Sequence, residues 1–257
     1  MARQRSEAIA STSVIAVIPA RLASTRLPEK ALADIGGVPM VVRVWRQASR
    51  AASASRVIVA TDHQRIYDAV KQAGGEAIMT SPDHQSGTDR IAEVARGISG
   101  EIFLNVQGDL PFIAPADLDA LARPMLDDPS LAMGTLATPI TDPAEFRNPN
   151  VVKVVLGASG NALYFSRSPI PYPRDDRDRV PAAAQRHIGV YAYRRDFLLR
   201  FAALPAGVLE RIEKLEQLRA LENGYTIRVV PSVAPSLEID TAEELAKARE
   251  LVGRGAA

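Results

Sequence analysis

The 257-residue sequence predicts an α/β fold, a Rossmann-like three-layer nucleotidyltransferase sandwich with an inserted antiparallel lobe. In the first half, short β-branched apolar runs alternate with amphipathic segments, which indicates parallel strands joined by right-handed crossovers. After Pro139 the pattern changes to paired runs typical of antiparallel strands. There is no internal repeat and no linker. We therefore expect a single domain over residues 14–257, with the lobe at roughly residues 140–205.

Hydrophobic periodicity places the elements of the first half. We expect strands at Val14–Ile18, Arg56–Ala60, Glu76–Met79 and Glu101–Val106, and helices at Met40–Ala51, from Asp62 to Ala73 and from about Thr88. Asp62 is the expected N-cap of the second helix, because a carboxylate accepts hydrogen bonds from first-turn amides. Gly74 and Gly75 end that helix.

The second half combines strands, a long loop and two helices. The expected strands are Val151–Leu156, Ala162–Phe165, Arg186–Tyr193 and Tyr225–Val230; the helices are Leu209–Glu222 and Thr241–Val252. The first two strands pair around the turn at residues 157–161. Pro169–Ala184 is rich in Pro, Asp and Arg, which is typical of an exposed loop. Leu209–Glu222 carries an apolar stripe at Leu209, Ile212, Leu215 and Leu218.

Composition excludes several classes of site. The 31 basic and 30 acidic residues give no overall field for binding nucleic acid, so an anion site must come from a local group of cations. The absence of cysteine rules out disulfides, thiolate zinc sites and a thiol nucleophile. With only His63, His84 and His187, an all-histidine zinc site is improbable. We expect any metal to be a hard cation held by carboxylates.

No apolar run approaches the roughly 20 residues that span a bilayer, so no membrane insertion is expected. Residues Met1–Ser13 contain no apolar stretch typical of a secretory signal and read as a disordered polar tail. The expected location is cytoplasmic.

The loop Pro19–Lys30 directly follows the first strand, where open α/β sheets bind ligands. It carries Arg21, Arg26 and Lys30 with Ser24 and Thr25 between them, a combination suited to a triphosphate. Solvated basic loops are also common, so spacing alone leaves both interpretations open. The loop lacks the Gly-x-Gly-x-x-Gly and Walker patterns, which disfavours a dinucleotide-binding fold and a P-loop enzyme.

Two aspartates are candidate metal ligands. Asp109 follows the predicted strand 101–106, and Asp240 precedes the last helix. Either one alone has a structural explanation, Asp109 as a turn residue before Pro111 and Asp240 as an N-cap. Together at one sheet edge they could hold Mg²⁺ between substrate phosphates. Residues Asp83–Arg90 likewise suit either helix capping or base recognition.

Taken together, these segments resemble the 3-deoxy-manno-octulosonate cytidylyltransferase (CMP-Kdo synthetase) family, from about Val14 to Val252. The matching blocks are Ile18–Lys30, Ala60–His63, Asp83–Arg90, Asn105–Pro111, Asn148–Val155, Ala162–Arg167, Arg186–Tyr191 and Lys214–Arg219. Their shared order over the whole length is far more specific than any single block.

The resemblance implies transfer of CMP from CTP to the acid sugar 3-deoxy-D-manno-octulosonate (Kdo), with release of pyrophosphate, for lipopolysaccharide biosynthesis. It implies that Arg21, Arg26 and Lys30 neutralise the triphosphate with help from Ser24, and that Ala20, Gly87 and Thr88 recognise cytosine and ribose. It also implies Mg²⁺ on Asp109 and Asp240, with Arg21, Lys30 and both aspartates catalytic. The implied sugar-binding residues are Gln107, Arg167, His187, Tyr191, Glu216 and Gln217. Family members form homodimers through the antiparallel lobe, so a homodimer is expected.

The sequence departs from the family pattern at four places. Glu29 stands where glycine is common, which puts a negative charge beside the triphosphate unless the side chain points to solvent. Leu110 replaces a frequent glutamate, Ser81 replaces a frequent arginine, and residues 237–239 replace a Gly-Val step before Asp240.

Two alternatives stay open beside Kdo activation. One is a cytidylyltransferase for a related acid sugar, 8-amino-Kdo or a sialic acid. The other is a catalytically silent nucleotide-binding domain, which the joint presence of Arg21, Lys30, Asp109 and Asp240 disfavours.

Overall fold

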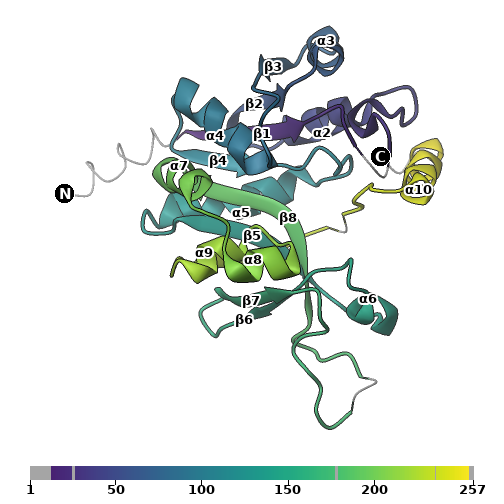
Figure 1. Cartoon of the computed structure of the whole chain (residues 1–257). Helices are drawn as coiled ribbons and strands as arrows, with labels where there is room; N and C mark the ends of the chain where they lie inside the picture. The colour runs from purple at the N-terminus through teal and green to yellow at the C-terminus, as the bar shows by residue number, and fades with distance from the viewer. Residues whose placement is uncertain (1–12, 25–26, 177–178, 235, 255–257) are drawn as a thin grey trace.

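The computed structural model describes residues 13–24, 27–176, 179–234 and 236–254. Within these ranges one sheet of nine strands forms the centre (Figure 1), with the order β3–β2–β1–β4–β8–β5–β9 and with β6 and β7 off this path. The strands are β1 (Val14–Ala20), β2 (Ala54–Thr61), β3 (Glu76–Met79), β4 (Ile102–Asn105), β5 (Met133–Pro139), β6 (Lys153–Leu156), β7 (Ala162–Ser166), β8 (Gln185–Arg194) and β9 (Ile227–Pro231).

The helices among the described residues are η1 (Lys30–Leu32), α2 (Met40–Ala48), α3 (Gln64–Gln72), α4 (Gly87–Gly97), α5 (Pro115–Asp127), α6 (Pro143–Arg147), α7 (Arg195–Ala203), α8 (Val208–Glu213), α9 (Leu218–Glu222) and α10 (Ala242–Gly253). Helices α2, α3 and α5 cover one face of this sheet, and α4, α7 and α9 cover the other. Along β1, Ala16 and Ile18 pack with α2, α3 and α5, whereas Ile15 and Val17 pack with α4, α7 and α9. This alternation follows from the two-residue period of a strand. It confirms the predicted three-layer α/β sandwich.

The direction of the strands decides where polar side chains gather. β1 pairs in parallel with β2 and β4, so the carboxyl ends of these strands share one edge. β8 runs antiparallel to β4 and pairs Tyr191 with Asn105, the last residue of β4. The residues of β8 before Tyr191 therefore extend beyond β4 on the same edge. A register shift against β5 bulges β8 at Gly189 and Val190 and redirects the side chains around it.

The predicted antiparallel pair of the lobe is confirmed: β6 pairs with β7, with Val154 opposite Phe165. β6 also joins β8 through Lys153 and Val154, which links the pair to the central sheet (Figure 1). Ile140, Phe146 and Ala184 form a small separate core beside it. On another side of the molecule, Leu245 and Ala248 of α10 pack with Ile35, Met40 and Ile239. No helix among the described residues combines the length and apolar character needed to cross a membrane.

Three sequence-based expectations were wrong in detail. The N-cap of α3 is His63, whose Nδ1 accepts a hydrogen bond from the Arg65 amide, whereas the Asp62 carboxylate pairs with Arg90. The helix predicted over Leu209–Glu222 is two short helices, because Lys214 adopts a left-handed conformation with φ of 54°. The break leaves Ile212 72% exposed. The expected helix 40–51 already ends at Ala48. The expected tail falls outside the described residues except for Ser13.

Candidate active site

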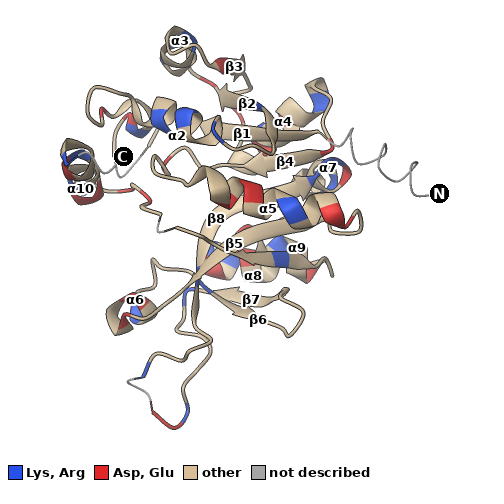
Figure 2. Cartoon of the chain, turned by 180° about the vertical axis from the view of Figure 1, so that it is seen from behind, with Lys and Arg blue, Asp and Glu red and all other residues tan. Residues whose placement is uncertain are grey.

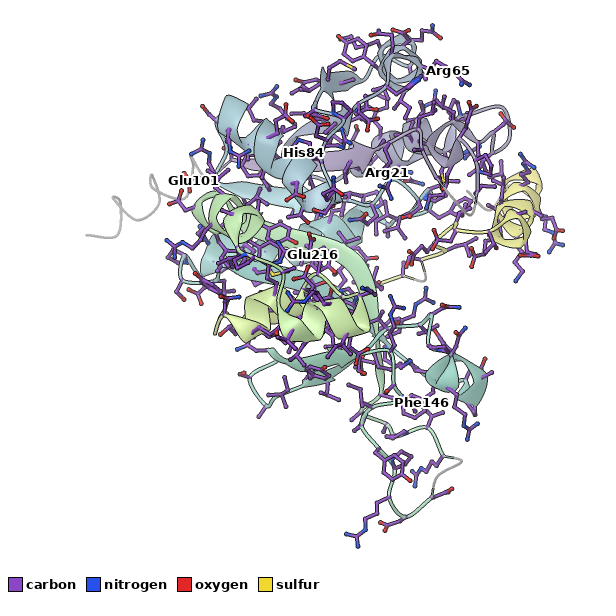
Figure 3. The ribbon with its side chains drawn as sticks, viewed as in Figure 1. Arg21, Arg65, His84, Glu101, Phe146 and Glu216 are labelled. Atoms are coloured by element: carbon purple, nitrogen blue, oxygen red, sulfur yellow. The ribbon has the colours of Figure 1, made fainter. Side chains whose placement is uncertain are left out.

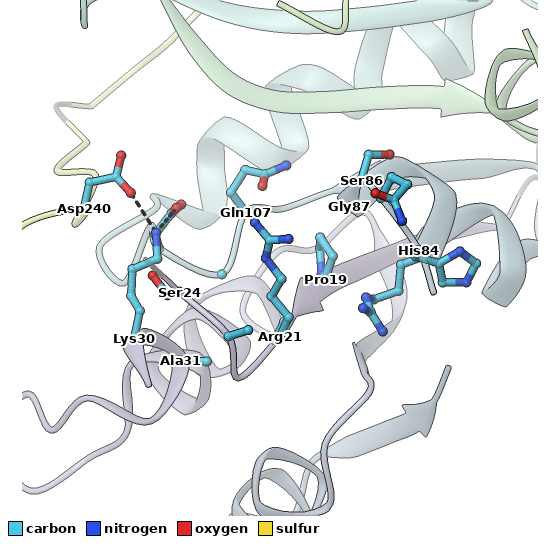
Figure 4. A pocket seen from close by; sticks show the side chains of 16 residues that line it. Pro19, Arg21, Ser24, Lys30, Ala31, His84, Ser86, Gly87, Gln107 and Asp240 are labelled. Atoms are coloured by element: carbon cyan, nitrogen blue, oxygen red, sulfur yellow. Dashed lines mark hydrogen bonds and ion pairs between the residues drawn. The ribbon is translucent and has the colours of Figure 1, made fainter. Parts of the chain in front are cut away.

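A cavity of about 320 Å³ lies at the carboxyl edge of β1 and β4. Its walls come from four segments: the loop after β1, the segment that leads into α4 with the start of that helix, the turn after β4, and Asp240 before α10 (Figure 4). The predicted residues that line it are Ala20, Arg21, Ser24, Lys30, Gly87, Gln107, Asp109 and Asp240. The fold thus brings the cationic loop and both aspartates together from positions as far apart as 20 and 240.

Lys30 lies between the two aspartates. Its Nζ donates hydrogen bonds to Asp109 Oδ2 at 2.7 Å and to Asp240 Oδ1 at 2.9 Å (Figure 4). Burial lowers the pKa of Lys30, but the charges and hydrogen bonds of the two carboxylates outweigh burial and raise the pKa overall. The ammonium group therefore carries its charge at neutral pH. Thr241, not Asp240, caps α10, so capping does not account for the position of Asp240.

Glu238 adds a third carboxylate that the sequence analysis missed. Single carboxylate oxygens of Asp109, Glu238 and Asp240 lie within 4.8 Å of one another. Glu238 is exposed as a residue, but neighbouring protein atoms partly desolvate its carboxyl group. This desolvation, followed by the charges of Asp109 and Asp240, raises the pKa of Glu238 to about 7. The i, i+2 spacing of Glu238 and Asp240 was the available signal, because alternate residues of an extended segment share a side.

The donor set fits a hard divalent cation. All three groups offer carboxylate oxygens, the ligand type that Mg²⁺ prefers. Asp109 Oδ1 is buried without a hydrogen-bond partner among the described residues, and such an oxygen is costly to leave unpaired. Lys30 places a positive charge against the same carboxylates. The site is thus built around a cation, whether ammonium or metal.

The Glu29 carboxylate is turned toward a helix on the outer side of the loop. It forms a two-pronged ion pair with Arg65 on α3, in which Arg65 Nη2 donates to Glu29 Oε2 at 2.8 Å. Its hydrogen bond to Arg65 also lowers the pKa of Glu29. The backbone of Glu29 has φ of 52°, a left-handed conformation that glycine adopts without steric cost. Glu29 therefore keeps the left-handed backbone conformation that glycine would adopt at this position, and Arg65 neutralises its added charge.

The N-terminus of α4 forms the opposite wall of the cavity. Ser86 and Asp89 make a reciprocal capping box, and the helix dipole adds partial positive charge at this end. Gly87 packs against Pro19, since a Cβ on Gly87 would lie 3.1 Å from Pro19 Cγ. A Cβ on Gly108 would lie 3.1 Å from the Pro19 carbonyl oxygen. Both glycines let the surrounding backbones approach the first strand closely.

Arg90 and His84 tie the loop before α4 to its neighbours. Arg90 is 3% exposed, lines the cavity and donates to Asp62 Oδ2 at 2.7 Å and to the Thr80 hydroxyl. His84 pairs with Glu93, which lies on α4 itself. Arg90 was not predicted individually as a site residue, because an arginine in a helix is usually exposed.

A second cavity of about 1180 Å³ adjoins the first and shares Gly87, Gln107 and Asp240 with it. Arg21 lines the smaller cavity and Glu216 lines the larger one; both side chains are labelled in Figure 3. The larger cavity contains all six residues expected to bind the sugar: Gln107, Arg167, His187, Tyr191, Glu216 and Gln217. Thr88, expected near the nucleotide, also lines this cavity and donates a hydrogen bond to Glu216 Oε2.

His187 and Tyr191 come from the bulged part of β8. His187 Nε2 lies 2.9 Å from the Thr135 hydroxyl, and its ring contacts Phe165 edge-on. Burial, assisted by the positive charge of Arg186, lowers the pKa of His187 to about 3, so the imidazole is neutral at physiological pH. Tyr191 donates to Gln217 Oε1 at 3.2 Å, and burial raises the pKa of Tyr191. Both side chains therefore offer neutral hydrogen-bonding groups.

Two polar atoms in the larger cavity are buried without a hydrogen-bond partner among the described residues. They are Glu216 Oε1 and Gln217 Nε2, an acceptor and a donor on consecutive residues. Burial raises the pKa of Glu216 and outweighs its hydrogen bond from Thr88. Glu216 Oε1 also lies 3.7 Å from Arg219 Nη2, which is an ion-pair contact without a hydrogen bond. A buried polar atom that lacks a hydrogen bond is destabilising, so these atoms suit a hydroxylated ligand. Of the predicted site residues, Arg26 alone lies outside the described ranges.

The comparisons with known proteins agree with this geometry. A family model described as cytidylyltransferase matches residues 15–227. The 3-deoxy-manno-octulosonate cytidylyltransferase of Trichlorobacter lovleyi is 52% identical and covers 94% of this chain and 99% of its own. The enzyme of the same name from Syntrophotalea carbinolica is 54% identical, over 91% of this chain and 96% of its own.

A solved structure of a CMP:2-keto-3-deoxy-manno-octonic acid synthetase complexed with CTP is 45% identical. It superimposes with a TM-score of 0.90 and covers 95% of this chain and all of its own. At this identity and coverage, the likeness goes beyond a shared fold. The chain belongs to the 3-deoxy-manno-octulosonate cytidylyltransferase family.

Proposed function

We propose that this chain transfers CMP from CTP to the anomeric hydroxyl of Kdo, giving CMP-Kdo and pyrophosphate. One observation carries the proposal: a cavity lined by Arg21 and Lys30 shares the lining residues Gln107 and Asp240 with a larger polar cavity. A triphosphate in the first and a sugar acid in the second would meet at this junction. Attack by the sugar hydroxyl on the α-phosphorus then displaces pyrophosphate in line.

Stabilisation of phosphate charge is the main task of the smaller cavity. In phosphoryl transfer, positioned cations lower the barrier by neutralising charge that builds on phosphate oxygens. Arg21 and Lys30, with the N-terminal end of α4 opposite, supply positive charge from two walls. Figure 2 shows basic and acidic residues interspersed on the outer helices. Arg21 and Lys30 in the smaller cavity differ from this mixed pattern, because they lie together on one loop.

Mg²⁺ is the proposed cofactor, and Asp109 and Asp240 would hold it, with Glu238 within reach. The metal would neutralise phosphate oxygens and orient the triphosphate. Lys30 already contacts both aspartates. When Mg²⁺ binds to these carboxylates, the ammonium group of Lys30 would turn toward the phosphates.

Recognition of the sugar acid falls to the larger cavity. Arg167 is the proposed partner of the sugar carboxylate, because a guanidinium binds carboxylates through paired hydrogen bonds. Its Nε and Nη1 already donate to Glu213 O and Pro149 O, which fixes the direction of the side chain. Neutral His187 and Tyr191 suit sugar hydroxyls. So do the Glu216 and Gln217 atoms that lack a hydrogen bond among the described residues.

We further propose a homodimer formed through the lobe, a cytoplasmic location and a role in lipopolysaccharide biosynthesis. The dimer is supported by β7, which pairs only with β6 among the described strands and carries Leu163, 65% exposed. On neighbouring α8, Ile212 is 72% exposed. Apolar side chains on an unpaired strand edge are typical of an interface. Equilibrium sedimentation at micromolar concentration tests the dimer, and a monomer there would contradict it.

Pyrophosphate release tests the enzymatic proposal. Purified protein with Mg²⁺ is offered each of the four nucleoside triphosphates with Kdo, 8-amino-Kdo or a sialic acid. We expect release only with CTP, and fastest with Kdo. Faster turnover of 8-amino-Kdo or sialic acid would reassign the sugar, and no turnover with any pair would favour the silent nucleotide-binding alternative.

A further inference from the structure

Lys153 is fully buried at the start of β6 and lies outside both cavity walls. Its Nζ donates three hydrogen bonds to backbone carbonyl oxygens: Asn148 at 2.9 Å, Val151 at 2.5 Å and Arg167 at 2.6 Å. A buried lysine normally has a carboxylate partner. Here each of the three acceptors is a neutral carbonyl, so the charge of the ammonium is solvated but not cancelled.

The three carbonyl contacts favour the protonated form of the Lys153 amino group. A neutral amine has only two N–H donors, whereas an ammonium has three. Burial and the positive charge of Arg167 lower the pKa of Lys153. Three short contacts to acceptors oppose that effect, because they are fully satisfied only by the charged form. Lys153 is therefore a positive charge fixed inside the lobe.

The three carbonyls belong to segments that wall the larger cavity. Residues 148–152 form one part of that wall, and Arg167 forms another. A second bridge joins the same segments, since Arg167 Nη1 donates to Pro149 O at 3.0 Å. Glu213 accepts from the Arg167 amide and from the Ser166 hydroxyl, so it is the nearby acid. Lys153, Arg167 and Glu213 together carry a net charge of +1 beside the cavity.

We propose that Lys153 is a positioning residue for the acid sugar: it fixes residues 148–152 against Arg167 and adds positive potential for the substrate carboxylate. This inference rests on the proposed function of the larger cavity. It assigns to Lys153 a role in sugar binding but none in nucleotide binding, because the ammonium touches no segment of the smaller cavity.

Steady-state kinetics of Lys153→Met test the proposal, with CTP and Kdo varied separately. Methionine keeps the length of the side chain but removes the charge and the donors. We expect KM for Kdo to rise by about tenfold or more, while KM for CTP stays within about twofold. Arg194→Met is the matched control, because Arg194 also donates to three carbonyls, those of Met125, Asp128 and Leu131, away from both cavities. It should lose stability but keep both KM values.

Equal changes in both KM values, or an unchanged KM for Kdo, would overturn the proposal. No turnover by the wild-type protein would instead overturn the proposed function. If Lys153→Met does not fold, Lys153→Gln retains two donors and should still raise KM for Kdo. Hydrogen exchange on the wild-type protein decides the matter if neither variant folds. Saturating Kdo should slow exchange of the amides at residues 150–152, and unaltered exchange there would contradict the proposal.

Discussion

At the scale of single residues, the centre of the site is a balance between one ammonium and three carboxylates. Lys30 contacts Asp109 and Asp240 directly, and Glu238 lies within reach of both. Three acidic groups so close together repel one another unless a cation is present. The raised pKa of Glu238 is the consequence of its desolvation and of that repulsion. The proposed Mg²⁺ and the triphosphate would therefore interact through the same few atoms.

Asp109→Asn should lower kcat by at least about a hundredfold, because the amide is neutral and binds Mg²⁺ poorly. Pyrophosphate release across a range of Mg²⁺ concentrations measures this, with circular dichroism to confirm the fold. Asp119→Asn is the matched control, since Asp119 accepts hydrogen bonds from the Ser53 and Ala52 amides away from the cavities. Near-normal rates for Asp109→Asn at limiting Mg²⁺ would refute the metal assignment.

Glu29→Gly should change KM for CTP by no more than about twofold, because Arg65 already neutralises the carboxylate and exposed ion pairs contribute little. Glu29→Ala is the informative comparison. It also removes the ion pair but keeps a Cβ at φ of 52°, so it should melt at a lower temperature than Glu29→Gly. Markedly tighter CTP binding by Glu29→Gly would show that the carboxylate acts on the triphosphate after all.

At the scale of elements, close packing at the carboxyl edge of the sheet sets the shape of the smaller cavity. β1 leads into the cationic loop, and the turn after β4 lies against Pro19 at the end of β1. The capping box of α4 fixes the third wall. Small displacements of any of these segments would alter the distance between the loop and Asp109.

Gly108→Ala tests this packing. Its new Cβ would lie 3.1 Å from the Pro19 carbonyl oxygen, so a backbone must shift by a few tenths of an ångström. We expect a loss of about 1 kcal/mol in stability and a KM for CTP raised by roughly threefold or more. Gly97→Ala, where a Cβ meets nothing within 4 Å, should leave KM unchanged. An unaltered KM for Gly108→Ala would mean that this contact does not shape the cavity.

Elements with a clear period were predictable from the sequence, and those set by tertiary contacts were not. The continuous apolar run Val14–Ile18 and the turn at Gly74 gave correct elements because their causes are local. The break at Lys214 was missed, since no glycine or proline marks it. The spacing of Glu238 and Asp240 could have been noticed, but their approach to Asp109 depends on the tertiary fold. Lys153 is held by backbone carbonyl groups, which no residue pattern reveals.

At the scale of the whole molecule, the buried polar groups that serve the larger cavity also shape stability. His187 lies at the junction of the lobe and the central sheet, where β8 passes between β5 and β6. Its ring is neutral in the folded protein because burial disfavours the charged form. The unfolded chain has no such restriction.

Folding stability should therefore fall as pH drops below 6.5, the pKa of an unperturbed histidine, toward the folded pKa of about 3. In that window the unfolded state binds a proton that the folded state does not. Between pH 6.5 and pH 5 the loss from this group amounts to between about 1 and 2 kcal/mol. Urea unfolding of wild type and His187→Gln at both pH values measures it. Between these pH values the free energy of unfolding should fall by about that much less in the glutamine variant than in the wild type. Identical pH dependence of the two proteins would contradict a neutral buried His187.

The central claim is that the cationic loop and the carboxylates lie beside a sugar cavity so that a nucleotide can be transferred. Phosphorus NMR of the protein incubated with CTP, Kdo and Mg²⁺ tests it most directly. We predict that the triphosphate signals are replaced by those of pyrophosphate and of one new phosphodiester. The mass of that product, measured by mass spectrometry, should be the mass of CMP-Kdo. Hydrolysis of CTP without that phosphodiester, or an unchanged spectrum, would contradict the account.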